Sequence, residues 1–135
     1  MRSMVLLLVL PFVCACSSTM RVVVESNRTT NQGKTFYVMA RNVGSETFLT
    51  EDYDDVAAKL YPRDMESVLD AKSVFPGKPV ELKFEQPTDK DITLYVFFTK
   101  HQGDAWRVAL TRPLPSDVIV ELGTNQIVRV LYRKR

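Results

Sequence analysis

The thiol of Cys16 is the side chain of this sequence with the clearest chemical context. It closes the run Val13-Cys14-Ala15-Cys16, in which a branched apolar residue and two small residues precede a cysteine. Such a lipobox marks the cysteine that is acylated once a bacterial signal peptide is cleaved. Cys16 fits better than Cys14, because bulky Val13 is a poor residue immediately before a cleavage site. The pattern predicts cleavage before Cys16 and a covalent lipid on its thiol and amine.

The residues before the lipobox favour the same interpretation. Arg2 precedes an apolar run from Met4 to Val13. That run has the length of a signal-peptide h-region and is about half of what a membrane-spanning helix needs. The alternative is an ordinary secretory signal with two incidental cysteines. We therefore predict that residues 1–15 are removed and that residues 16–19 form the acylated cysteine and a short tether.

The remaining candidates for catalysis are weak. His101 is the only histidine and lies in the polar stretch Lys100–Asp104, which favours a solvated loop residue over a general base. The sequence contains no G-x-S-x-G motif, and processing leaves neither cysteine as a free thiol. We predict a protein without catalytic residues, and an enzyme is the least favoured class.

An acidic cluster raises the question of a calcium site. It consists of Glu51, Asp52, Asp54 and Asp55. The cluster lacks the glycine and the distal glutamate of an EF-hand loop. Negative charge in the first turn of a helix is stabilised by the helix dipole, which explains the cluster without a metal. We predict no metal site and no cofactor other than the lipid on Cys16.

Two further features leave alternatives open. Trp106 could be a platform for stacking a sugar ring, but it lies among alternating apolar residues and is expected in the core or as a partial surface anchor. The terminal Arg133, Lys134 and Arg135 could contact anionic lipid headgroups or form a solvated tail. The net charge of +2 falls to about +1 without Arg2, and this balance argues against a nucleic-acid partner.

The elements that would position these residues are mostly strands. Apolar segments at intervals of about ten residues, separated by turn signals, predict a β-sandwich over residues 20–135. A further strand is predicted to begin between Glu66 and Lys72 and to run to Phe75, and Ile92–Thr99 is the most apolar segment and is expected at the centre of a sheet. The other predicted strands are Met20–Glu25, Thr35–Arg41, Val80–Glu85, Ala105–Leu110, Asp117–Leu122 and Gln126–Tyr132.

One segment, Thr50–Tyr61, has helical periodicity instead. Its apolar residues with helical spacing are Tyr53, Val56, Ala57 and Leu60. Thr50 is the expected N-cap, and Pro62 ends the helix because proline cannot continue it. The predicted fold is therefore mainly β, a two-sheet sandwich with one short helical insertion.

The order and spacing of these features resemble the outer-membrane lipoprotein of type VI secretion systems, the TssJ/SciN family. The matching features include the lipidated Cys16, two valine-rich strands around the polar loop Ser26–Lys34, and an acidic helix over Phe48–Leu60. The later ones are Phe75-Pro76-Gly77, Gly103-Asp104-Ala105-Trp106-Arg107 before a proline-containing loop, and a last strand after Thr124-Asn125-Gln126-Ile127.

The resemblance implies a transthyretin-like sandwich that hangs from the inner leaflet of the outer membrane, on its periplasmic face. Its partner would be the periplasmic C-terminal region of the large inner-membrane subunit, TssM. In the family, the loops between strands one and two and between strands six and seven face that partner. These loops correspond here to Ser26–Lys34 and Thr111–Ser116. The candidate partner-binding residues are Asn27, Arg28, Asn31, Arg112 and Leu114.

A second function class remains open. A lipid-anchored periplasmic module could bind a small ligand or a glycan through Trp106 and tyrosine side chains. The two classes differ in whether the ring of Trp106 is available at the surface, and in whether a large inner-membrane protein co-purifies with this chain.

Overall fold

The computed structural model describes residues 18–133, so the predicted signal peptide, Cys16 and the last two residues lie outside the described range. Eight strands make up most of it. They are β1 (Thr19–Glu25), β2 (Phe36–Asn42), β3 (Val68–Val74), β4 (Val80–Glu85), β5 (Ile92–Val96), β6 (Arg107–Leu110), β7 (Asp117–Leu122) and β8 (Ile127–Arg133). The helical pieces are α1 (Ser45–Thr50), α2 (Tyr53–Ala57) and the single turn η1 (Thr30–Gly33).

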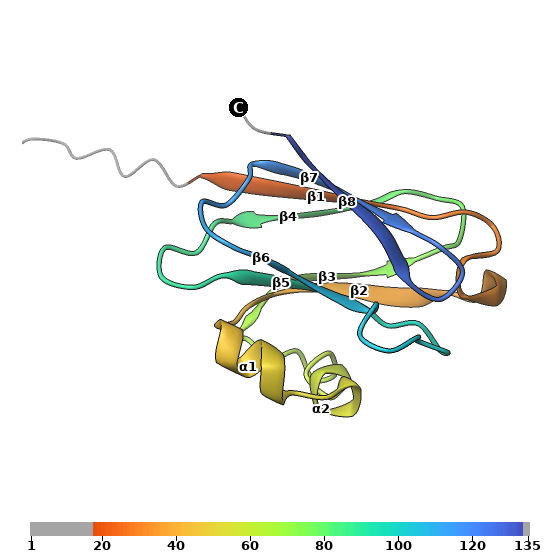
Figure 1. Ribbon diagram of the computed structural model, residues 1–135, viewed down its shortest axis with the longest axis horizontal. Helices are drawn as coiled ribbons and strands as arrows, with labels where there is room; N and C mark the ends of the chain where they lie inside the picture. Colours follow the sequence, from red (N-terminus) through yellow and green to blue (C-terminus); the bar gives the residue numbers. More distant parts are fainter. Residues whose placement is uncertain (1–17, 134–135) are drawn as a thin grey trace, which may run out of the picture.

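The strands form two four-stranded sheets that lie face to face (Figure 1). The first sheet has the order β4-β1-β7-β8, and the second has the order β3-β2-β5-β6. Apolar side chains from both sheets fill the space between them, with Val22, Leu82 and Val118 among those that are 1% exposed or less. The predicted two-sheet β-sandwich with a helical insertion is confirmed.

β1 lies inside the first sheet and is bonded on both sides. It pairs antiparallel with β4 and parallel with β7. The hydrogen bonds reach back to the first described residue, because the Ser18 carbonyl accepts from the backbone N–H of Gln86 at 2.8 Å. The tether predicted over residues 16–19 is therefore too long: Thr19 already belongs to β1, and Ser18 is bonded beside it.

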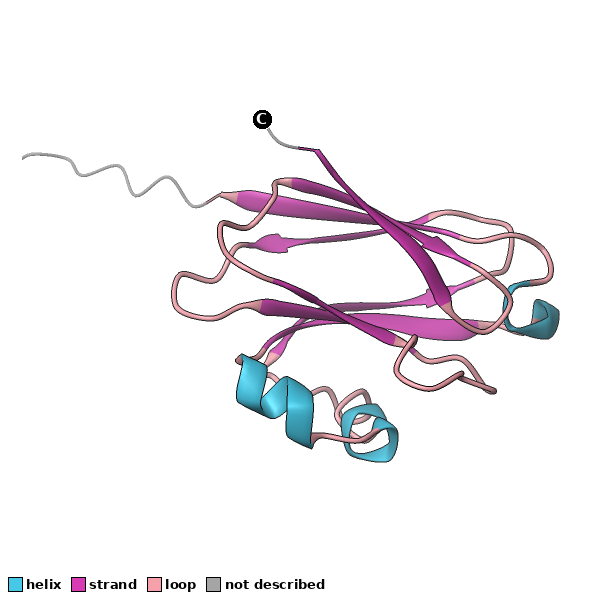
Figure 2. Cartoon of the chain, viewed as in Figure 1, coloured by secondary structure: helices cyan, strands magenta, loops and turns pink. Residues whose placement is uncertain are grey.

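β5 lies inside the second sheet, as its apolar sequence predicts, and all five of its residues are buried. Burial on both faces needs a cover on each side. One is the first sheet, and the other is the helical segment, which lies against the outer face of the second sheet (Figure 2). The same cover buries Met39 and Arg41, which alternate to the outer face of β2.

The single helix predicted over Thr50–Tyr61 is wrong, because the segment divides into α1 and α2. Glu51 has an extended backbone (φ −82°, ψ 133°) and ends α1. Asp52 is also extended, and its side chain caps α2 by accepting from the N–H of Asp55 at 2.9 Å. The Asp55 carboxylate accepts in return from the N–H of Asp52, which completes a capping box. The N-cap is thus Asp52 and not Thr50.

Candidate functional site

The loop Ser26–Lys34, between β1 and β2, is the first predicted partner-binding segment, and it is more ordered than its polar sequence suggests. Three consecutive residues have positive φ angles: Asn31 (54°), Gln32 (53°) and Gly33 (75°). Glycine and asparagine tolerate this left-handed region, whereas for glutamine it is unfavourable by about 1 kcal/mol. The surrounding contacts must therefore hold the turn in place.

The side chain of Asn31 stabilises this turn through hydrogen bonds. Its amide nitrogen donates to the carbonyl of Lys34 at 3.1 Å, and its amide oxygen accepts from the backbone N–H of Thr99 at 2.8 Å. Its backbone N–H donates to the carbonyl of Thr124 at 2.7 Å. Asn31 is 0% exposed, so it is not available to a partner and the prediction that it binds one is wrong. It ties the loop to the β5–β6 and β7–β8 connections.

Further contacts gather the connections into one surface, which we call the 26–34 end. Gln32 donates to the side-chain oxygen of Asn125 at 2.7 Å, across the β7–β8 turn. The hydroxyl of Ser26 accepts from the N–H of Gly77 at 3.1 Å, in the turn between β3 and β4. Gly77 has φ +88°, and a Cβ at this position would lie 3.2 Å from Cγ of Arg28, so a larger residue would be both strained and crowded there.

Asn27 and Arg28 remain candidates for contact at this end. Asn27 is exposed, but its side-chain oxygen already accepts from the N–H of Thr29 at 2.9 Å and from the Thr29 hydroxyl at 2.6 Å. Arg28 is exposed, and the ion pairs formed within residues 18–133 do not include it. Of the five candidates, Arg28 has the side chain that is least engaged in hydrogen bonds, ion pairs or core packing within residues 18–133.

The second predicted segment, Thr111–Ser116, lies at the opposite end of the sandwich, which we call the 111–116 end (Figure 1). The backbone N–H of Arg21, near the start of β1, donates to the carbonyl of Ser116 at 2.9 Å. Ser26–Lys34 follows the other end of the same strand. Seven residues of β1 separate the two loops by roughly 20 Å. They therefore do not form one continuous patch, and the expectation that both loops face the partner stays a prediction.

Arg112 and Leu114 are also less available than predicted. The guanidinium of Arg112 donates to the carbonyl of Lys90 at 2.9 Å and to that of Pro87, so it holds the β4–β5 connection. Leu114 is partly buried and packs against the core. A truncation at either position would change the domain itself as well as any contact that it makes.

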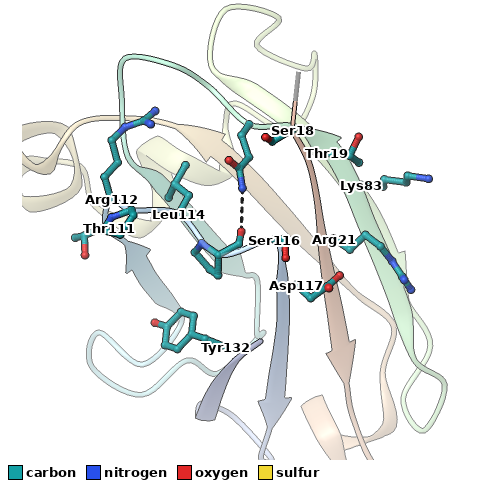
Figure 3. A pocket seen from close by; sticks show the side chains of 13 residues that line it. Ser18, Thr19, Arg21, Lys83, Thr111, Arg112, Leu114, Ser116, Asp117 and Tyr132 are labelled. Atoms are coloured by element: carbon teal, nitrogen blue, oxygen red, sulfur yellow. Dashed lines mark hydrogen bonds between the residues drawn. The ribbon is translucent and has the colours of Figure 1, made fainter. Parts of the chain in front are cut away.

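A groove opens at the 111–116 end, with a volume of about 1050 Å³ (Figure 3). Its basic lining residues are Arg21, Lys83 and Arg112, and its single acidic one is Asp117. Ser18 and Thr19, where the described chain begins, form part of its wall. The side-chain amide of Gln86 donates to the Pro115 carbonyl at 3.0 Å, which joins two of the segments that line the groove. Sequence reasoning missed this groove, because its residues come from four separate segments of the chain.

The ring of Trp106 is buried, as predicted, with 3% exposed. It packs among the aromatic rings beneath the helical segment, 5.0 Å from Tyr53 and 5.7 Å from Tyr95 between ring centroids. The exposed ring of His101 stacks on Tyr53 at 4.2 Å. A glycan platform needs an accessible indole face, so the alternative function loses its main side chain.

A buried ion pair joins the helical segment to the second sheet. The guanidinium of Arg41 donates to the Glu51 carboxylate at 2.6 Å, to the Ser67 hydroxyl at 3.0 Å and to the Tyr95 hydroxyl at 3.3 Å. The side chain of Arg41 is 3% exposed and that of Glu51 is 18% exposed. In the acidic cluster, Asp52 and Asp55 thus form the capping box and Glu51 forms this pair, while Asp54 lies in the first turn of α2.

Burial affects two of the tyrosines in this region. It raises the pKa of the Tyr95 hydroxyl above its usual value of 10.0, although the nearby Arg41 opposes the shift. It also raises the pKa of Tyr53, and the negative charge of Asp54 adds to that increase. Both phenols are therefore protonated at neutral pH, and Tyr53 donates to the carbonyl of Phe98 at 2.9 Å.

Residues 18–133 contain no group of three or more His, Cys, Asp or Glu side chains placed to share a metal ion. No helix of that range has the length and apolar character needed to cross a bilayer.

Comparison with solved structures shows the same sandwich in components of type VI secretion systems. Serratia marcescens Lip, a membrane-bound component of the system, matches with a TM-score of 0.65 and 16% identity over 88% of this chain and 99% of Lip. The lipoprotein TssJ1 from Pseudomonas aeruginosa matches with a TM-score of 0.67 and 12% identity over 88% of this chain and 98% of TssJ1.

A chain in a structure described as the TssM C-terminal domain from EAEC also matches, with a TM-score of 0.67 and 18% identity over 85% of this chain and 98% of that chain. The resemblance drawn from the sequence is thus confirmed in the fold. No curated protein sequence matches this chain.

The family described as "IglE, N-terminal domain" matches residues 37–122, which is more than half of the chain. The match runs from β2 to the end of β7 and so includes the helical segment, the β5–β6 connection and the Thr111–Ser116 loop. This chain therefore belongs to the IglE N-terminal domain family and has the β-sandwich fold of the type VI secretion lipoproteins.

Proposed function

We propose that this chain is a non-enzymatic lipoprotein of a type VI secretion machine. Acyl chains on Cys16 hold it on the periplasmic face of the outer membrane. Its 26–34 end binds the periplasmic C-terminal region of a TssM-like inner-membrane subunit. The protein would thereby connect the two membranes of the envelope. The fold shared with Lip and TssJ1 supports the assignment to the secretion machine.

The observation that carries the proposal is the placement of the two ends of β1. Ser18, two residues after Cys16, is hydrogen-bonded at the 111–116 end. The 26–34 end lies at the far end of the same strand, roughly 20 Å away. A lipid at Cys16 would therefore keep the 111–116 end near the bilayer and present the 26–34 end to the periplasm. A partner that reaches up from the inner membrane would meet that end first.

The chemistry of the 26–34 end suits a protein partner. Asn31, Gln32 and Ser26 hold its connections in one arrangement, so a partner need not order them on binding. Arg28 is exposed on this fixed surface, and among residues 18–133 it forms no ion pair. Arginine is enriched at interface hot spots and forms paired hydrogen bonds with carboxylates. We expect an acidic group of the partner to meet Arg28.

The lipid anchor is tested by Cys16→Ser in the full chain. We expect the wild-type protein to fractionate with the outer membrane and to carry the mass of the acyl chains. The variant should lose both, because serine offers no thiol for acylation. A variant that stays in the outer-membrane fraction, or a wild-type protein without added acyl mass, would contradict the anchor.

The partner site is tested by titrating the periplasmic C-terminal domain of the TssM-like subunit onto folded variants of this protein. Arg28→Ala should weaken binding by about 2 kcal/mol, which is the loss expected at a hot spot. Arg133→Ala is the matched control, because Arg133 is an exposed arginine at the end of β8, where the strand reaches the 111–116 end. Equal affinities for both variants would remove the 26–34 end from the interaction.

A further inference from the structure

We propose that the groove at the 111–116 end lies on the membrane surface and holds the phosphate-bearing headgroups of the bilayer. The proposal rests on the proposed function, because it assumes the lipid on Cys16. It assigns a ligand class to a groove that the partner site does not use.

The length of chain before the groove limits where the groove can lie. Cys16 is two residues before Ser18, and two extended residues reach roughly 7 Å. Ser18 and Thr19 form part of the groove wall. The acylated cysteine must sit at the headgroup level, since its acyl chains enter the bilayer there. The groove mouth is therefore within one headgroup layer of the anchor.

The groove cannot move independently of the start of β1. The Ser18 carbonyl accepts from Gln86 N–H at 2.8 Å on one side, and the Arg21 N–H donates to the Ser116 carbonyl at 2.9 Å on the other. These bonds join β1 to the walls of the groove on both sides. The groove therefore moves with the start of β1, and its wall stays within reach of the two residues that join Ser18 to Cys16.

The lining has the chemistry of a headgroup site. Arg21 and Lys83 lie on one side and Arg112 on the other, with Tyr132 at the lower rim in Figure 3. Lysine and arginine attract anionic lipids, and tyrosine is enriched where water meets the bilayer. Negative charge is also present, because Asp117 lines the groove and Glu81 pairs with Arg21 at 2.9 Å.

Apolar groups complete the groove and explain why it suits a lipid surface better than a free anion. Pro113, Leu114 and Pro115 form part of the same wall. A headgroup presents both a phosphate and the glycerol and acyl carbons beneath it. Arg133, at the end of β8, pairs with Asp117 in the strand register and adds a cation beside the groove. This placement favours the lipid-contact alternative for Arg133; Lys134 and Arg135 lie outside the described residues.

The test measures which end of the acylated full-length protein touches the bilayer. Thr111 in the groove wall and Gln102 at the other end of β6 are exposed, so each can be changed to cysteine and labelled with a fluorophore. The proteins are reconstituted in vesicles of phosphatidylcholine and phosphatidylglycerol that carry a quencher on the headgroup. We expect strong quenching of the Thr111→Cys label and none of the Gln102→Cys label. Circular dichroism confirms that each variant is folded.

A charge comparison tests the headgroup chemistry in the same vesicles. Arg21→Gln with Lys83→Gln should reduce quenching at Thr111→Cys, and should do so only when phosphatidylglycerol is present. The matched pair is Arg28→Gln with Lys34→Gln, which removes the same two charges from the 26–34 end and should leave quenching unchanged. Equal effects of the two pairs would overturn the assignment of headgroups to this groove.

The possible failures are distinguishable. If the acylated protein does not float with the vesicles, the lipid anchor fails and the groove proposal falls with it. If the protein floats but the two labels are quenched equally, or neither is quenched, only the groove proposal is overturned. A Thr111→Cys label that responds to the TssM-like periplasmic domain, and not to the bilayer, would assign the groove to the protein partner instead.

Discussion

Removing the charge of Glu51 should destabilise the domain by about 3 kcal/mol. Breaking a buried ion pair by changing one partner leaves the other charge without compensation, which costs about 3–5 kcal/mol. Arg41 cannot regain water, because its side chain is 3% exposed, whereas Glu51 keeps some hydration at 18% exposed. The residual hydration places Glu51→Gln near the lower end of the range. The loss should persist in high salt, since salt screens exposed charges much more than buried ones.

Urea unfolding followed by Trp106 fluorescence measures this loss, because Trp106 is the only tryptophan and lies beside Tyr95 in the buried aromatic cluster. The matched control is Glu121→Gln, which breaks the exposed pair with Arg129 at 2.8 Å and should cost at most about 1 kcal/mol. The double variant Arg41→Met with Glu51→Met should be destabilised by less than the sum of the losses in the two single variants, Arg41→Met and Glu51→Met. The reasoning is refuted if Glu51→Gln costs no more than the control, or if the single changes add.

Three further predictions concern the buried tryptophan, the left-handed turn at Asn31 and the buried tyrosine hydroxyl groups. Trp106→Ala should lower the free energy of unfolding by about 3–5 kcal/mol in urea titrations, because its 3% exposed ring would leave a cavity; a loss near zero would place the ring at the surface. Asn31→Ala should cost about 1 kcal/mol more than Asn31→Gly in the same assay, since glycine accepts φ 54° without strain and alanine does not; equal losses would mean that the lost hydrogen bond to Thr99 accounts for both. Raising the pH above 10.0 should destabilise the protein, because folding raises the pKa values of Tyr95 and Tyr53 and the unfolded chain therefore releases those protons first. The urea midpoint should fall between neutral and alkaline pH, and it should fall less in Tyr95→Phe than in the wild type. An equal fall in both proteins would contradict the role of the Tyr95 phenol.

The strands were predictable because each one carries its own signal. Asp117–Leu122 and Val80–Glu85 have the bounds that alternation and turn residues predict. In both segments one face is buried and the other is solvated, so the period of two is visible in the sequence. The identity of Cys16 as the acylation site stays a prediction, because Cys16 lies outside the described residues.

The helical segment was harder to predict, because the interactions that divide it are not periodic. Asp52 ends one helix and caps the next, and the acidic residues around it support either arrangement. Arg41 illustrates a similar limit: a charged residue in alternation usually faces water, and only the cover from a segment ten residues later buries it. One usable signal was present, since Arg41 follows Met39 on the same face of β2 and so continues an apolar row.

The candidate site was predicted at the level of loops but not of side chains. A polar loop that contains Asn-Gln-Gly was correctly expected to be a connection, but its composition does not reveal that Asn31 turns inward. The sequence also does not reveal that two loops lie at opposite ends, because that depends on the parallel pairing of β1 with β7. Pairing between strands about ninety residues apart has no local signature.

The position of β1 has a mechanical consequence. Any pull applied through the residues before Thr19 acts along the axis of β1, which has neighbours on both sides, β4 and β7. A load applied at the start of β1 and resisted at the 26–34 end stretches these two hydrogen-bond ladders in shear, so many bonds bear the force at once. Had the chain entered through an edge strand pulled sideways, the bonds would separate one after another. The topology thus makes the domain a stiff link between whatever holds its two ends.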